Sequence, residues 1–410
     1  MTSPAVEPFD PFLPELRADP YPVYHRYREA SPVHWCPPGE SAGARGAWYL
    51  FRYADVTRVL RDPRFVREAR RVLPAESFPP IPESQRPFWE TTDRWILFRD
   101  PPDHTRLRSL VNRAFSPGVV ETRRRRIERV ADKLLDAVAG ASELDLLRDF
   151  AFPLPVIVIA ELLGVPPQDR DRVKLWSARL TAALDLKPTR MGYESGSEAV
   201  LEFTAYLREI IAQRRRHPQD DLISRLIASE TEGGKLSEDE LVSNSILLVF
   251  AGHETTVNLI GNGMLALLQH ADQLALLRRR PELLPGAVDE LLRYDAPVQV
   301  TRRLPLEDVE LGGHLIRRGQ EARLLLGAAN RDPEVYPDPD RLDITRSGPL
   351  HNSFGLGIHF CLGAPLARAE AAIAIAALLR RFPALRLLDE APAWRDTVGL
   401  RGLVRLRVGL

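Results

Sequence analysis

The chain has little cysteine, no excess of charge and no long apolar run, and each of these absences excludes a class of protein. Its 410 residues include two cysteines, Cys36 and Cys361, too few for a disulfide framework or a zinc site. The 56 basic and 56 acidic side chains cancel, so the composition does not favour binding to nucleic acid. The most apolar early stretch, residues 150–163, is too short to span a bilayer. We therefore expect neither a nucleic-acid-binding protein nor a membrane protein.

Signals for secretion and for division into domains are also lacking. Residues 1–10 contain no basic segment followed by an apolar one, which predicts a cytoplasmic protein without a signal peptide. No glycine- and serine-rich linker, low-complexity tract or fixed-period repeat interrupts the chain. We expect one domain over residues 1–410, with a small β-rich part formed by the N-terminal segment and residues 298–327. Lysine is scarce relative to arginine, which hints at a GC-rich bacterial genome.

The apolar periodicity predicts a mainly α-helical chain with small β-sheets. The clearest expected helices cover residues 22–30, 53–61, 123–139, 150–163, 237–270 and 365–381. Strands are expected over residues 47–51, within 298–327 and over 400–410. Residues 65–99 carry several prolines and no period, and such long irregular segments are usually functional.

The strongest helical pattern, residues 237–270, is apolar nearly all round and should cross the core. It opens with a capping box, in which Ser237 is followed three residues later by Glu240.

Cys361 lies in a glycine-containing run, residues 354–363, directly before an alanine-rich helical pattern. The N-terminus of a helix favours negative charge and lowers the pKa of a nearby thiol. A thiolate held in this way can serve as an axial ligand of iron and donate electron density to the metal. The alternative is a buried cysteine with a purely structural role.

The run resembles the haem-binding loop of the cytochrome P450 family, F-x-x-G-x-H/R-x-C-x-G. The five matching residues are Phe354, Gly357, His359, Cys361 and Gly363. The resemblance implies the cytochrome P450 fold, with haem b between the long central helix and the helix of the cysteine loop. It also implies that Cys361 binds the iron and that Phe354 and Gly363 contact the cofactor.

The central helix contains the sequence A-G-H-E-T-T, which begins at Ala251. Polar groups in a buried helix are costly unless they are used, and Gly252 removes bulk so that a flat cofactor or O2 can approach. The sequence is similar to the oxygen-activation motif of the same family, A/G-G-x-D/E-T-T. The resemblance implies that Thr255 holds a water or the oxygen ligand of the iron, and that Glu254 relays protons. We interpret His253 as a packing neighbour rather than an iron ligand.

Glu290 and Arg293 form an E-x-x-R pair on one face of an expected helix. Such a pair is common on protein surfaces. In the cytochrome P450 family it is a buried structural ion pair, completed by an arginine of a later meander. The run that starts at Pro339 resembles that meander and makes Arg341 the expected third member, with Arg346 as the alternative.

Haem propionates require cations or hydrogen-bond donors. Residues 100–108 resemble the family's D-P-P-x-H-x-x-x-R helix, which implies that His104 and Arg108 bind propionates. His359 and Arg303 are further candidates, since arginine suits carboxylates through its planar fork. For each residue alone, an ordinary surface charge is the alternative.

The expected substrate wall is apolar and aromatic, which predicts a lipophilic substrate of medium to large size. The candidate residues are Phe88, Trp89, Trp95, Leu97, Leu180, Leu184 and Val298. The resemblance leaves polyketides, terpenoids, steroids and fatty acids open as substrate classes, which is typical of secondary metabolism.

By the same resemblance, the expected activity is a haem-thiolate monooxygenase that uses O2 to hydroxylate or epoxidise its substrate. Electrons would pass from NAD(P)H through a reductase and a separate ferredoxin to a monomeric enzyme, with Arg106 or Arg113 at the docking surface. The alternatives are a peroxide-driven haem-thiolate enzyme, which Glu254 and Thr255 argue against, and a non-catalytic haem protein that acts as a sensor or recruitment partner.

Overall fold

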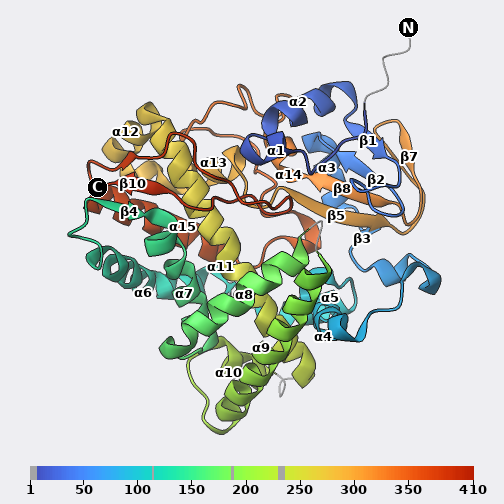
Figure 1. Ribbon diagram of the computed structural model, residues 1–410, viewed down its shortest axis with the longest axis horizontal. Helices are drawn as coiled ribbons and strands as arrows, with labels where there is room; N and C mark the ends of the chain where they lie inside the picture. The colour runs from blue at the N-terminus through green and yellow to red at the C-terminus, as the bar shows by residue number, and fades with distance from the viewer. Residues whose placement is uncertain (1–6, 113–114, 186–188, 230–235) are drawn as a thin grey trace. The chain divides into compact units, whose positions relative to one another are not determined.

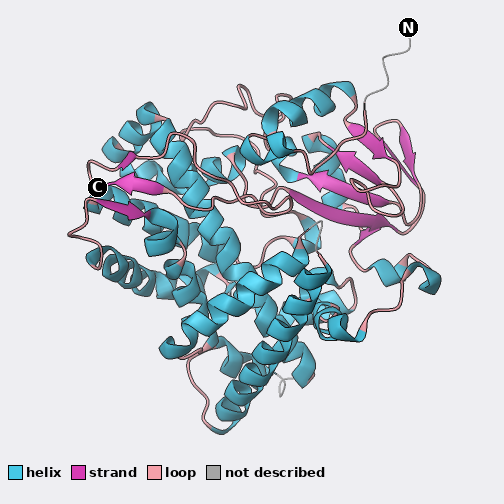
Figure 2. Ribbon diagram, viewed as in Figure 1, coloured by secondary structure: helices cyan, strands magenta, loops and turns pink. Residues whose placement is uncertain are grey.

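The computed structural model describes residues 7–112, 115–185, 189–229 and 236–410. The chain folds into two compact units, each assembled from separate stretches of sequence. The first unit comprises Met1–Phe78, Gly261–Cys361 and Asp389–Leu406, and the second comprises Pro79–Ile260, Leu362–Leu388 and Arg407–Leu410. Helix dominates, with three small sheets among the described residues, as Figure 2 shows.

The first unit is built on a five-stranded sheet in the order β1-β2-β8-β5-β3. These strands cover Val33–Cys36 (β1), Ala47–Leu50 (β2), Glu321–Leu325 (β8), Val300–Pro305 (β5) and Phe65–Val66 (β3). Strands β2 and β8 run parallel, and the other neighbours run antiparallel.

Strand β2 is buried on both faces because its side chains alternate between two apolar clusters. Trp48 and Leu50 pack in one cluster, while Ala47 and Tyr49 pack in the other. A strand covered on both sides reads as a continuous apolar run, as this one does.

Helices and a hairpin complete the unit (Figure 1). The helices are α1 (Pro14–Ala18), α2 (Tyr21–Ala30), α3 (Tyr53–Arg61), α12 (Ala271–Arg279), α13 (Leu284–Tyr294) and α14 (Leu326–Ala329). The hairpin strands are β6 (Val309–Leu311) and β7 (His314–Ile316). The turn between them uses Gly312 and Gly313, at φ 55° and 79°, a region that glycine enters without steric cost.

The second unit is mainly helical. Its helices are α4 (Arg86–Thr92), α5 (Asp103–Asn112), α6 (Pro117–Asp136), α7 (Pro153–Leu163), α8 (Arg170–Leu184), α9 (Arg190–Arg216), α10 (Leu222–Ser229) and α15 (Ala364–Arg381). A small sheet joins β4 (Glu143–Asp145), β10 (Arg407–Gly409) and β9 (Arg386–Leu387). Helix α11 (Glu238–Gln269) begins in this unit and ends in the first.

The predicted capping box of α11 is confirmed. The Ser237 N–H donates to Glu240 Oε2 at 2.9 Å, and the Glu240 N–H donates to Ser237 Oγ at 3.1 Å. This reciprocal pair satisfies two of the amide groups that the first turn of a helix leaves without partners.

The helix predicted within residues 150–163 is confirmed, since α7 covers Pro153–Leu163, begins at the proline and follows a π turn over Leu147–Ala151. Two other expectations about local structure were wrong in detail. Residues 65–99 are not irregular throughout, since they contain β3, α4 and several 3₁₀ turns. The terminal strand is confined to Arg407–Gly409. Within the described residues, no helix is both long and apolar enough to cross a membrane.

Helix α15 contains a buried carboxyl group that the sequence did not flag. Glu370 is 1% exposed, and neither of its carboxyl oxygens has a hydrogen-bond partner among the described residues. Burial raises the pKa of Glu370 well above its ordinary value. The folded protein therefore binds this proton more tightly than the unfolded chain does, and its stability falls as the pH rises above about 4.3.

Replacing Glu370 by glutamine removes this ionisation and should stabilise the protein more at pH 8 than at pH 5. We expect the free energy of unfolding to gain on the order of 1–3 kcal/mol at the higher pH. Urea denaturation at both pH values measures the difference. The exposed Glu128 supplies the control, because Glu128→Gln should have little effect at either pH. A gain from Glu370→Gln that does not change with pH would contradict the account.

Candidate functional site

The cysteine loop is shaped by backbone contacts and by two glycines. The Cys361 N–H donates to the Phe354 carbonyl at 2.8 Å, which closes the loop. Gly355 and Gly357 have φ values of 65° and 69°, where other residues are strained. A Cβ on Gly357 would lie 2.6 Å from the Leu60 carbonyl oxygen, so only glycine fits there. The loop thus holds Cys361 partly exposed.

Helix α15 begins three residues after Cys361 in the sequence. Gly363 is its N-terminal cap residue, and the Gly363 carbonyl accepts the Ala367 N–H at 2.9 Å. The positive end of the helix therefore follows the cysteine directly along the chain, an arrangement that favours a thiolate.

In the second unit, one face of α11 remains open in the middle of an otherwise buried helix. Ala251 is exposed and Thr255 is half-buried, whereas Glu254 is 4% and His253 1% exposed. Ala251 and Thr255 are one turn apart, and the Thr255 hydroxyl donates to the Ala251 carbonyl at 3.1 Å. This side of α11 therefore presents the exposed Ala251 and the half-buried Thr255 hydroxyl.

Gly252 packs against a neighbouring helix. A Cβ on Gly252 would lie 3.0 Å from the Ile159 side chain of α7. The glycine therefore permits close packing between α7 and α11, and Ala251 is the residue that faces outward. His253 makes a hydrogen bond through Nδ1 to the Val249 carbonyl at 2.8 Å, and its Nε2 is 3.9 Å from a Glu254 oxygen.

The four propionate candidates lie in different units. His104 and Arg108 are one turn apart on α5 of the second unit, where His104 is 3% exposed and Arg108 half-buried. In the first unit, Arg303 is buried, whereas its neighbour Arg302 is exposed on the opposite face of β5. His359 is half-buried in the cysteine loop.

Arg67 is a cation that sequence reasoning missed. Its Nη1 donates to Thr301 Oγ1 at 3.1 Å, and Arg303 Nη1 donates to the same hydroxyl at 3.3 Å. The two guanidinium groups converge because β3 pairs with β5, so Arg67 follows directly on a strand of the same sheet. No local pattern in the sequence indicates that pairing.

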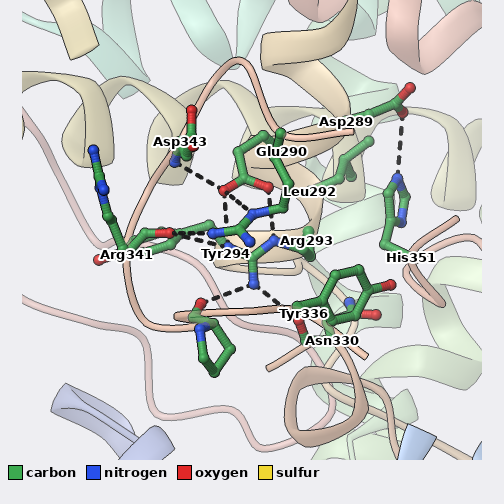
Figure 3. A network of polar contacts seen from close by, with 12 residues as sticks. Asp289, Glu290, Leu292, Arg293, Tyr294, Asn330, Tyr336, Arg341, Asp343 and His351 are labelled. Atoms are coloured by element: carbon green, nitrogen blue, oxygen red, sulfur yellow. Dashed lines mark hydrogen bonds and ion pairs between the residues drawn. The ribbon is translucent and has the colours of Figure 1, made fainter. Parts of the chain in front are cut away.

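Glu290 and Arg293 form a buried two-pronged ion pair on α13, as Figure 3 shows. Arg293 Nε and Nη2 donate to the two Glu290 oxygens at 2.7 and 2.8 Å. Arg293 Nη1 also donates to the carbonyls of Asn330 and Pro339, at 2.9 and 2.8 Å. The pair therefore ties α13 to the segments that follow it in the first unit.

The third member of this network is Arg346, so the prediction of Arg341 was wrong. Arg346 Nε donates to Glu290 Oε1 at 3.2 Å, and the Asp343 N–H donates to the same oxygen at 2.9 Å. Arg341 contributes its main-chain carbonyl to Arg293 at 3.3 Å, while its side chain is exposed and points away in Figure 3. The turn at Asp338, whose φ is 47°, leads into the stretch that presents this carbonyl inward.

Comparison with known proteins places the chain in a family. Residues 171–392 match the family model for cytochrome P450. The chain is 43% identical to the polyketide biosynthesis cytochrome P450 PksS of Bacillus subtilis, over 98% of each chain. It is 42% identical to the biotin biosynthesis cytochrome P450 of the same organism, over 96% of this chain and 97% of the relative.

Solved structures agree. A crystal structure of P450BioI in complex with hexadec-9Z-enoic acid ligated acyl carrier protein matches with a TM-score of 0.90 and 41% identity, covering 97% of this chain and 99% of the other. The chain belongs to the cytochrome P450 family. The predicted fold and haem-thiolate monooxygenase class are confirmed, and this cytochrome P450 uses haem b, O2, electrons from NAD(P)H through redox partners, and lipophilic substrates.

The residues of this P450 fit such a cofactor. Cys361 is partly exposed and carries sulfur, the donor type that haem-thiolate iron requires. Ala251 is exposed and follows a fully buried stretch of the same helix, residues 241–250.

The residues predicted for the substrate wall of this P450 differ in burial. Phe88, Trp95 and Leu180 are at most 1% exposed. The other four candidates retain exposed area. These are Trp89, Leu97, Leu184 and Val298.

Of the two arginines considered for docking, only Arg106 lies within the described residues. Arg106 forms an ion pair with Glu240 at the start of α11, with Nη2 2.5 Å from Oε1. Its guanidinium therefore has an intramolecular partner and is not simply an exposed charge. Arg113 lies outside the described residues.

Proposed function

We propose that this P450 hydroxylates or epoxidises a long aliphatic substrate, with Cys361 as the axial thiolate ligand. The observation that carries the proposal is the cysteine loop, in which two positive-φ glycines and the Cys361 amide hold Cys361 partly exposed. When bound, the haem supplies the cleavage of O2 and the transfer of one oxygen atom to carbon, while the other atom leaves as water.

Glu254 and Thr255 supply the protons that formation of this water consumes. The Thr255 hydroxyl donates to the Ala251 carbonyl and can still accept a hydrogen bond from a water molecule on the open face of α11. Glu254, in the preceding position, can exchange a proton with water through its carboxyl oxygens.

The remaining predicted residues bind or shape the cofactor site. His104, Arg108, Arg303 and His359 bind the propionates, and Arg67 is added to this group because it shares Thr301 with Arg303. Ala251, Phe354 and Gly363 contact the porphyrin, and Gly252 acts behind them by its packing on α7. Residues 1–410 form one monomeric catalytic domain, of which the two compact units are the parts.

Relatives support the substrate class. Their names include polyketide biosynthesis for PksS, and P450BioI was crystallised with an acyl carrier protein that bears hexadec-9Z-enoic acid. A second solved structure, of CYP267B1, contains myristic acid. Long aliphatic chains are common to the ligands of these two structures, and the partly exposed wall residues Leu97, Leu184 and Val298 are aliphatic. Electrons come from a ferredoxin.

The test begins with the carbon monoxide difference spectrum of the reduced protein. A panel of fatty acids, polyketide lactones, terpenoids and steroids is then screened by the spin-state shift of the haem. Ligands that bind are incubated with NADPH, a surrogate ferredoxin and its reductase. Oxygenated products from the fatty acids or polyketides support the proposal. A thiolate spectrum with no turnover, or with turnover of the terpenoids or steroids alone, contradicts it.

Replacing Thr255 by alanine should uncouple electron consumption from oxygenation. NADPH is still consumed, but product per NADPH falls by on the order of tenfold or more because proton delivery is misdirected, and hydrogen peroxide rises. The matched control is Thr256→Ala, since Thr256 is buried and its hydroxyl donates to the Gly252 carbonyl at 3.2 Å. Coupling that is unchanged in Thr255→Ala, or lowered equally in both variants, removes the assigned role.

A further inference from the structure

Asn244 joins α11 to a distant segment of the second unit by hydrogen bonds to its main chain. The Ile96 N–H donates to Asn244 Oδ1 at 2.8 Å, and Asn244 Nδ2 donates to the Arg94 carbonyl at 3.0 Å. One side chain thus makes hydrogen bonds to the main chain on both sides of residue 95, as a neighbouring strand would. The same Nδ2 donates to the Glu240 carbonyl at 2.8 Å, which fixes the rotamer of the amide. Asn244 is 4% exposed, so these bonds do not compete with bulk water.

An aromatic stack continues this attachment along α11. The Trp95 ring lies nearly parallel to Phe250 of α11, at 6.1 Å and 21°, and to Phe98, at 6.0 Å and 13°. Phe250 directly precedes Ala251, the exposed residue of the open face. The segment 94–98, which we call the wall segment, is therefore attached at Asn244 and at the position before the reactive face.

Ion pairs also connect the first turn of α11 to the wall segment and to α5. Arg94 Nη2 is 3.8 Å from Asp239 Oδ2, and Arg106 of α5 donates to both oxygens of Glu240. Glu240 also accepts the Ser237 N–H in the capping box. The first turn of α11 thus contacts both the wall segment and α5 through charged side chains.

The attachment of the wall segment also positions Leu97, which lies between Trp95 and Phe98 in the sequence. The buried Trp95 ring stacks on Phe98 and Phe250, whereas Leu97 and Phe98 both keep part of their surface exposed. The position of Leu97 depends on the two bonds of Asn244, because these bonds fix the main chain on both sides of the closely packed Trp95. A side chain held in this way can discriminate between ligands by shape at little entropic cost.

We propose that Asn244 is a positioning residue for substrate selectivity, which holds the wall segment and Leu97 beside the open face of α11. The inference rests on the proposed function, since it assigns that face to the reaction. It predicts that replacing Asn244 weakens the binding of large ligands and leaves the binding of small ligands of the haem iron nearly unchanged.

The experiment measures dissociation constants spectroscopically for imidazole, 4-phenylimidazole and myristate in the wild type and in Asn244→Ala. We expect the constants for the two larger ligands to rise about fivefold or more, and that for imidazole to stay within about twofold. Asn244→Asp keeps the acceptor for Ile96 but places an oxygen against the carbonyls of Arg94 and Glu240, so it should raise the same two constants at least as much as Asn244→Ala does. Ser245→Ala is the matched control, because the buried Ser245 hydroxyl donates to Leu241 of its own helix at 2.7 Å.

Parallel changes for all three ligands, or no change for the larger ones, would overturn the proposal. Loss of haem from both Asn244 variants would also overturn it, because the residue would then be structural only. Failure of the proposed function is seen separately, as a wild-type protein that lacks the thiolate spectrum or does not oxygenate the panel.

Discussion

Replacing Cys361 by alanine is expected to abolish the thiolate spectrum of the reduced carbon monoxide complex and to lower turnover by roughly a thousandfold or more. The sulfur is the electron donor that oxygen cleavage requires, and alanine supplies no ligand in its place. Absorbance spectroscopy of the purified variant, with haem content determined separately, measures the effect.

Cys36 provides the matched control for this prediction. Its sulfur accepts the Phe9 N–H at 3.2 Å inside the first unit, and it is buried. Burial raises the pKa of Cys36 to about 11, so the group stays a neutral thiol at pH 7. Cys36→Ala should therefore leave the spectrum unchanged. An unaltered spectrum in Cys361→Ala, or an equal loss in the two variants, would remove Cys361 from the iron.

Replacing Arg293 by alanine should destabilise the protein by about 3–5 kcal/mol, or prevent it from folding. The change leaves the Glu290 carboxylate buried with Arg346 as its remaining cation, and it removes donors from the carbonyls of Asn330 and Pro339. Buried polar groups that lose their partners keep the full cost of their desolvation. Chemical denaturation of the haem-loaded protein measures the loss.

Two further arginines make this prediction specific. Arg346→Ala should cost about 1–3 kcal/mol, since it removes one hydrogen bond to a buried carboxylate. Arg341→Ala should cost less than about 0.5 kcal/mol, because only the main chain of Arg341 takes part in the network. A larger loss for Arg341→Ala than for Arg346→Ala would contradict the structure of this network.

Features that depend on neighbours along the chain could be predicted from the sequence. The capping box at Ser237, the helix over Tyr53–Arg61 and the glycine-shaped cysteine loop all follow from contacts within a few residues. Local sterics and local hydrogen bonds decide such features, so a pattern of residues is sufficient to indicate them. Family and activity could be predicted for the same reason, since their motifs are short and local.

Features that join distant segments required the folded chain. Arg346 rather than Arg341 reaches Glu290, Gly252 packs against Ile159, and Trp95 is packed against Phe250. The bonds of Asn244 to Arg94 and Ile96 join residues about 150 positions apart. Periodicity tells which residues are buried but carries no information on which buried groups meet, because close packing and the satisfaction of polar groups are decided only when the segments come together.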